Sequence, residues 1–112
     1  MQLPQEGALL RIFIGEADRY MGQPLYEWIV VQALEQGLAG ATVLRGMMGF
    51  GGGTRRIQMF LFDALSEDLP VVVEVVDIQE SLERFFERIE PSIKAGLATL
   101  EKARIKFYRF EP

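Results

Sequence analysis

Apolar and polar residues alternate in several stretches of the chain with the period of two that is typical of β-strands. In the first stretch, Leu10, Ile12 and Ile14 share one face and Arg11 lies on the other. A later stretch, Val71–Val76, is β-branched and almost continuously apolar, which is typical of a central strand. The pattern predicts strands over residues 9–14, 41–44, 71–76 and 99–110. After the second of these and a glycine-rich stretch, extended structure resumes over 57–62.

Two further stretches have a helical period. Pro24–Gln36 begins with a proline, which favours the first helical position, and ends before Gly37. Its expected buried face holds Tyr26, Ile29, Val30, Ala33 and Leu34. The second helix is expected to follow Asp77, which with Glu80 forms a variant of the capping box. Its apolar stripe, which we interpret as core, holds Ile78, Leu82, Phe85, Phe86 and Ile89.

Two apolar residues of the first helix, Trp28 and Val31, fall within its polar arc. Single exposed apolar residues are common on protein surfaces, so chance exposure is one interpretation. The other is a contact between subunits, because tryptophan is enriched at interfaces and these residues are neighbours on the helix. The residues alone leave both open.

The predicted order of elements is βαββαβ. With right-handed crossovers it gives an α+β fold of ferredoxin-like type, in which two helices cover one face of a four-stranded antiparallel sheet. A chain of 112 residues suffices for one domain, placed over 1–112 with its core at about 8–110. The other sheet face stays open and includes apolar residues such as Phe13. An open apolar face predicts oligomers, and a ring of subunits with their sheets inward is the expected form.

Composition removes several classes of function. The net charge is −4, which disfavours nucleic-acid binding because such proteins need a positive surface for phosphates. The chain has no cysteine and no histidine, which excludes disulfides, cysteine nucleophiles and histidine-based triads or metal sites. Residues 1–6 lack the features of a secretory signal, and no uncharged apolar run approaches a membrane span of about 18–20 residues. We therefore expect a cytoplasmic protein.

The candidate functional segment is LRGMMGFGGGTRR at residues 44–56, whose glycine-rich loop spans about 46–56. So many glycines make the segment too flexible to be a folded element for its own sake. Glycines also let backbone N–H groups approach an anion closely, and the arginines add charge. The spacing fits neither a phosphate-binding P-loop nor a dinucleotide fingerprint. The residues leave two interpretations, an anion site or a mobile hairpin loop with solvated arginines. The candidate effector-binding residues here are Arg45, Gly46, Gly49, Phe50, Gly51, Gly52, Gly53, Arg55 and Arg56.

Five sequence blocks follow one another in a specific order: RIFIGE at 11–16, GQPLYE at 22–27, GATVLRG at 40–46, GFG at 49–51 and LSEDLPVV at 65–72. Together they resemble the bacterial and archaeal family called domain of unknown function 190, over about residues 9–107. Many members of that family carry a histidine where Gln58 stands here. A proton- or metal-dependent role at that position therefore does not transfer to this chain.

The resemblance implies a PII-like fold. PII-like proteins are cytoplasmic trimers that bind small effectors, adenine nucleotides in PII proteins, in clefts between subunits. A long loop after the second strand reports occupancy to a partner, often a membrane transporter. By position, Arg104 and Lys106 resemble last-strand basic residues that face phosphates there, and a neighbouring subunit would supply them. Genes of the family often lie near fluoride-channel genes, which suggests a link to fluoride export. We therefore expect a regulator rather than an enzyme.

Two other functions stay open. A small metal-dependent enzyme would use loop carboxylates such as Glu16, Asp18 or Glu67. A ligand-independent adaptor would bind a protein partner through the glycine-rich loop without any effector.

Overall fold

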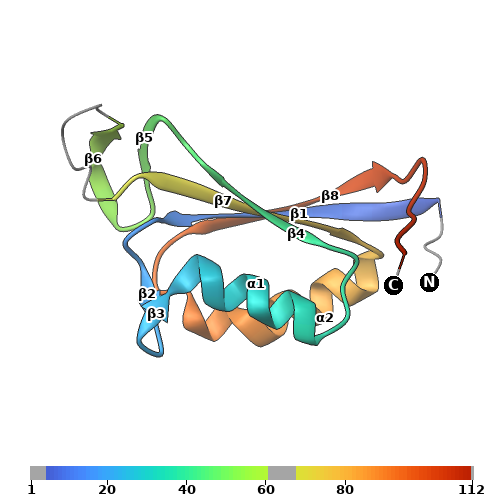
Figure 1. The fold of residues 1–112 in the computed structure, drawn as a ribbon. Coiled ribbons are helices and arrows are strands. Elements are labelled where there is room, and N and C mark those ends of the chain that lie inside the picture. The colour runs from blue at the N-terminus through green and yellow to red at the C-terminus, as the bar shows by residue number, and fades with distance from the viewer. Residues whose placement is uncertain (1–4, 61–67, 112) are drawn as a thin grey trace.

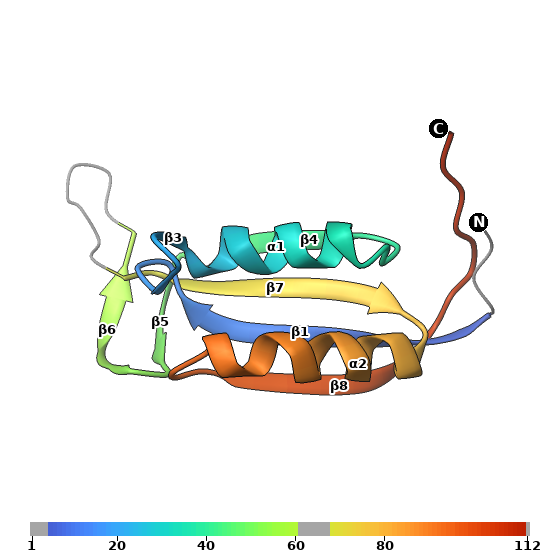
Figure 2. The same ribbon diagram turned by 90° about the horizontal axis from the view of Figure 1, so that it is seen from below.

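The computed structural model describes residues 5–60 and 68–111. Four strands form one antiparallel sheet in the order β4–β7–β1–β8, and two helices cover one of its faces (Figure 1). The view in Figure 2 shows both helices lying side by side along that face. The predicted ferredoxin-like arrangement is therefore confirmed. The strands and helices of this framework are β1 (Glu6–Gly15), α1 (Leu25–Glu35), β4 (Ala41–Arg45), β7 (Pro70–Asp77), α2 (Gln79–Ile89) and β8 (Leu97–Arg104).

The core lies between the sheet and the helices. Alternate residues of the two central strands point to the helices, and Ile12 pairs with Val73 at the centre, both fully buried. The buried residues of α1 lie about one turn apart along one side of the helix, and so do those of α2. Each helix therefore covers one half of the sheet (Figure 2). The buried apolar residues are Ala8, Leu10, Ile12, Ile14, Leu25, Ile29, Ala33, Leu69, Val71, Val73, Val75, Leu82, Phe85 and Ile89.

Helix α1 differs from its predicted pattern. Its buried row begins at Leu25, which the sequence interpretation missed, whereas Leu34 remains 78% exposed. The strip of α1 that contacts the sheet is narrower than the apolar face predicted for this helix, because only residues about four apart point directly at the sheet. Trp28 is half-buried and its ring lies edge-on to Tyr20 at 4.5 Å between centroids. The contact with Tyr20 thus accounts for part of the burial of Trp28 within one subunit. A contact between subunits at Trp28 and Val31 stays a prediction.

Helix α2 confirms the predicted stripe at its centre, since Leu82, Phe85 and Ile89 are buried. The predicted capping box is wrong. The residue before the helix is Ile78, and no side chain caps the helix. The Asp77 carboxylate instead accepts hydrogen bonds from the Ile78 amide at 2.7 Å and the Ala39 amide at 2.9 Å. Asp77 therefore ties the start of α2 to the turn before β4.

Several boundaries differ from the predicted ones. The segment after β1, expected as a loop, contains a small hairpin of β2 (Arg19–Tyr20) and β3 (Gln23–Pro24). The last strand was expected over 99–110, but β8 covers Leu97–Arg104 and a short 3₁₀ helix, η1 (Glu90–Ser92), precedes it. Strand β8 ends at Arg104 because its partner β1 begins at Glu6, the residue that pairs with Arg104. Residues 61 and 62, predicted as strand, lie outside the described part of the chain.

The open face of the sheet combines apolar ends with a charged centre. Arg11 lies in its middle and forms ion pairs with Glu74 at 3.0 Å and with Glu101 on β8. These carboxylates raise the pKa of Arg11, mainly through the hydrogen bond to Glu74. Near one end, Phe13 and Leu97 are 36% and 62% exposed. The predicted open apolar face is thus present, with an ion cluster at its centre.

Candidate functional site

The glycine-rich segment folds into a second, two-stranded sheet of β5 (Met48–Gly51) and β6 (Thr54–Met59). This β5–β6 hairpin lies across one end of the main sheet, beyond the end of β1, mostly on the side away from the helices (Figures 1 and 2). Its turn places Gly52 at a φ of +56°, a conformation that favours glycine. The expectation of a segment too flexible to fold is therefore wrong, because strand pairing orders most of it.

Glycine is required where the hairpin leaves the sheet. The Gly46 amide donates a 2.7 Å hydrogen bond to the Pro70 carbonyl. A Cβ atom at Gly46 would lie 2.9 Å from Pro70 Cγ and 3.3 Å from the Pro70 oxygen. By contrast, a Cβ at Gly51 would meet nothing within 4 Å. The close approach of two backbones explains Gly46 without any ligand.

Asp68 connects the hairpin to the main sheet. One carboxylate oxygen accepts a 2.9 Å hydrogen bond from the Ala17 amide, and the other accepts a 2.8 Å hydrogen bond from the Thr54 hydroxyl. The Asp68 amide donates to Gln58 Oε1 at 3.2 Å. Gln58 thus has a structural contact. Sequence reasoning missed Asp68 and Thr54, although an acidic residue just before a buried strand in the LSEDLP block was the available signal.

The three arginines of the segment have different surroundings. Arg45 pairs with Glu16 at 3.2 Å, and its guanidinium lies 5.9 Å from the centre of the Phe60 ring. Glu16 therefore neutralises much of the charge that was expected to attract an anion. Arg55 lies over the Phe50 ring at 4.8 Å. Arg56 is exposed and is not among the residues that line the cavity described next.

A cavity of about 340 Å³ lies between the hairpin and this end of the sheet. We call it the loop-end cavity. Phe13, Phe50, Pro70 and Leu97 contribute its apolar walls, and Arg55 contributes a cation. Asp68 and Thr54 also line it. Apolar walls with a few polar groups suit a flat ring that carries an anionic substituent.

The structure brings together some of the predicted effector-binding residues here. Of the predicted set, Phe50, Gly51, Gly52 and Arg55 line the loop-end cavity. Gly46, Gly49 and Gly53 belong to the same hairpin or its base, but they do not line the cavity. Gly46 and Gly49 face Pro70 instead.

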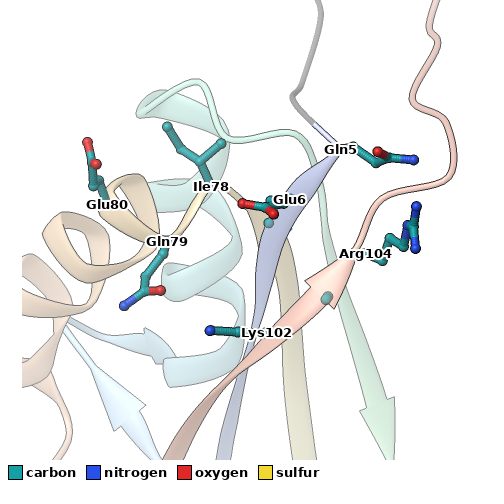
Figure 3. A pocket seen from close by; sticks show the side chains of 9 residues that line it. Gln5, Glu6, Ile78, Gln79, Glu80, Lys102 and Arg104 are labelled. Atoms are coloured by element: carbon teal, nitrogen blue, oxygen red, sulfur yellow. The ribbon is translucent and has the colours of Figure 1, made fainter.

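The predicted basic residues of the last strand lie at the opposite end of the sheet. The Arg104 backbone lies opposite Glu6, at the start of β1. The hairpin lies at the other end of β1, where Phe13, Ile14 and Gly15 line the loop-end cavity. Figure 3 shows a cavity of about 820 Å³ at this far end, where Lys102 and Gln79 point into the space between β8 and α2. Lys102 was missed, although its spacing of two from Arg104 was the signal. Lys106 lies beyond the end of β8. One subunit therefore does not bring these cations to the loop-end cavity.

The carboxylates considered for metal chemistry have structural partners. Asp18 accepts a 3.0 Å hydrogen bond from the Gly15 amide, and Glu16 pairs with Arg45. Glu67 lies outside the described residues. Over residues 5–60 and 68–111, no group of three acidic residues is arranged to hold a metal ion. In the same part of the chain, no helix is long and apolar enough to cross a membrane.

Solved structures with this arrangement define the class of the fold as PII-like. CPII, a nitrogen regulatory PII-like protein from Thiomonas intermedia K12, was solved bound to ADP, AMP and bicarbonate. It superimposes with a TM-score of 0.65 over 89% of this chain and 88% of its own, at 14% identity. A putative PII-like signalling protein from Thermus thermophilus gives a TM-score of 0.63 over 89% of each chain, at 16% identity.

Sequence relatives then identify the family. The family model DUF190, described as "Uncharacterized ACR", matches residues 7–105. A UPF0166 protein of Aquifex aeolicus (strain VF5) is 41% identical over 97 residues, which are 87% of this chain and 90% of that protein. A UPF0166 protein of Methanocaldococcus jannaschii is 35% identical over 86 residues, 77% of this chain and 78% of the relative. The chain belongs to the DUF190 family, as its sequence blocks predicted.

Proposed function

We propose that the protein is a PII-like regulator that binds a small anionic effector, an adenine nucleotide, where two subunits of a homotrimer meet. The observation that carries this proposal is the loop-end cavity, in which Phe13 and Phe50 provide apolar walls for a base and Arg55 provides a cation. The solved structure of CPII, which has the same fold, holds ADP, AMP and bicarbonate. An adenine nucleotide combines the flat ring and the negative charge that this cavity suits.

A second subunit completes the site in this proposal. Within one subunit, Arg55 faces the loop-end cavity while Glu16 neutralises Arg45. The phosphates need further cations, and these are available at the far end of a neighbour, from Lys102, Arg104 and Lys106. The open sheet face supports the assembly, because burying Phe13 and Leu97 between subunits removes apolar surface from water.

The proposed output is the position of the β5–β6 hairpin. Met48, Phe50, Ile57 and Met59 on the hairpin are all at least 45% exposed, so a partner protein can contact them directly. We place the protein in the cytoplasm, with a membrane transporter or a fluoride channel as the partner, and assign it no catalytic reaction.

Calorimetric titration of ADP, AMP, ATP and bicarbonate tests effector binding. We expect micromolar affinity for at least one nucleotide, which corresponds to about −8 kcal/mol. Arg55→Ala removes a charge-assisted contact and should weaken binding about tenfold or more. Arg88→Ala, at an exposed position in the last turn of α2, is the matched control and should bind as the parent does. Absence of heat with every ligand would overturn the proposal.

One observation favours a second function, a ligand-independent adaptor. The exposed apolar residues of the hairpin form a contact surface whether or not an effector is bound. A partner captured equally well with and without nucleotide, and equally well by the Arg45→Ala variant, would support the adaptor over the regulator.

A further inference from the structure

Three segments that are distant in sequence meet at Asp68. Its carboxylate accepts hydrogen bonds from Ala17, in the turn after β1, and from Thr54, at the start of β6. Asp68 directly precedes Leu69, which is 1% exposed and anchors the chain in the core just before β7. The carboxylate is therefore held at one side by the sheet and holds the hairpin at the other.

The packing around the carboxylate leaves it little freedom. A Cβ atom at Gly15 would lie 2.3 Å from Asp68 Oδ1, so the carboxylate occupies the space above a residue without a side chain. The Glu16 amide donates a 2.8 Å hydrogen bond to the Leu69 carbonyl, which fixes the backbone beside Asp68. The main sheet thus positions the acceptor for Thr54, and the Asp68 amide adds a second contact to the hairpin at Gln58.

The hairpin carries two walls of the loop-end cavity. Phe50 and Arg55 lie on β5 and β6, whereas Phe13, Pro70 and Leu97 belong to the main sheet. If the hairpin moved away, the apolar and cationic walls would separate. Thr54 adjoins Arg55, so its hydrogen bond acts at the point where the hairpin wall meets the cavity.

We infer that the Thr54–Asp68 hydrogen bond is a latch that holds the β5–β6 hairpin closed over the loop-end cavity and so couples the effector site to the partner-binding surface. This inference rests on the proposed function for the identity of the effector. Thr54 and Asp68 are positioning residues, which place Phe50 and Arg55. An effector that binds only the closed cavity shifts the hairpin further toward the closed position, and a partner that binds the open hairpin opposes the effector.

Limited trypsin digestion of the full chain without ligand tests the latch directly. Arg55 and Arg56 lie in a paired strand, so cleavage after them requires local opening, and its rate follows the open population when opening is fast. Thr54→Val removes the hydroxyl donor at nearly constant volume and should raise this rate by about tenfold, because hydrogen bonds to charged groups are among the stronger ones. Thr54→Ser keeps the hydroxyl and should cleave at the parental rate. Fragments are assigned by mass spectrometry, and the urea midpoint of each variant reports global stability.

The outcomes are distinct. Faster cleavage in Thr54→Val alone, at an unchanged urea midpoint, supports the latch. Equal rates in all three proteins, or equal acceleration in Thr54→Ser, would overturn it, since the hydroxyl would then not hold the hairpin. Repeating the digestion with ADP at roughly a thousandfold excess over a micromolar Kd should slow cleavage of the parent. If calorimetry shows no heat with ADP, AMP, ATP or bicarbonate while Thr54→Val still cleaves faster, the proposed function fails and the latch stands.

Discussion

On the helix-covered face of the sheet, Ile12 and Val73 are fully buried, whereas on the open face Phe13 and Leu97 keep 36% and 62% of their surface exposed. Both faces come from alternate residues of the same strands. The centre of the covered face is apolar, whereas the open face has Arg11 with two glutamates at its centre. One face of a sheet can therefore fold the subunit while the other remains available for contacts between subunits.

The ion cluster distinguishes the open face from a merely unfinished core. Glu74 and Glu101 raise the pKa of Arg11, so the guanidinium stays charged throughout the neutral range. Because folding raises this pKa, the stability that the charged Arg11 contributes is fully present at neutral pH and is lost only as the pH rises through the pKa of the folded protein.

A substitution in the covered face should have the greatest consequence. Phe85→Ala removes a fully buried ring from the core between α2 and the sheet. We expect the free energy of unfolding to fall by about 3–5 kcal/mol, because the cavity adds to the lost burial. Urea denaturation followed by circular dichroism measures it. Phe107→Ala, at a residue that is 68% exposed, is the matched control and should change stability little.

A substitution in the open face should have the second-largest effect, and it should leave the fold of the subunit intact. Leu44 lies on that face of β4 and is 50% exposed in the single subunit. Leu44→Asp should dissociate the proposed trimer, since it loses the burial of a leucine, about 1.5–3 kcal/mol per subunit, and adds a carboxylate to each. Sedimentation velocity measures the oligomeric state. Leu34→Asp is the control, because Leu34 is even more exposed but lies on α1. Dissociation by Leu34→Asp alone would move the interface to the helices.

A weaker effect is expected at the point where the hairpin leaves the sheet. Gly46→Ala places a Cβ 2.9 Å from Pro70 Cγ, and we expect a loss of about 1–2 kcal/mol from overpacking. Gly51→Ala meets no atom within 4 Å and should be neutral or slightly stabilising. Thermal unfolding of the two variants compares them. Equal stability would contradict the close approach of the Gly46 and Pro70 backbones.

The weakest effect concerns the centre of the open face. Arg11→Ala leaves Glu74 and Glu101 facing each other without their shared cation, while the subunit keeps its core. The dissociation constant of the proposed trimer should rise by less than about tenfold, as exposed ion pairs contribute little. Sedimentation equilibrium at neutral pH measures the change. Arg11→Lys keeps the charge, and its dissociation constant should lie between those of the parent and of Arg11→Ala. A variant that associates as tightly as the parent would show that the ion cluster has no part in assembly.

Much of the fold could be predicted from short-range patterns. The strand around Ile12 and the Val71–Val76 run were placed correctly because alternation and β-branching report burial directly. Helix α2 was found because its stripe is strongly amphipathic. Helix α1 was found by its boundaries, but its face was misread at Leu25 and Leu34, since apolar residues occur on both of its sides. The capping role of Asp77 was misread because its partner Ala39 is distant in sequence.

The candidate site, like the fold, could be predicted from the sequence only in part. Residue types alone singled out the glycine-rich segment and its arginines, and period two placed Arg104 and Lys106 on one face of a last strand that in fact ends at Arg104. Tertiary structure alone decided that Glu16 neutralises Arg45, that Arg55 faces the loop-end cavity, and that Asp68 holds Thr54. The physical reason is range. Backbone periodicity and propensity act over a few residues, whereas Asp68 contacts Thr54 and Ala17, which are 14 and 51 positions away and which only the packing of the whole sheet brings to it.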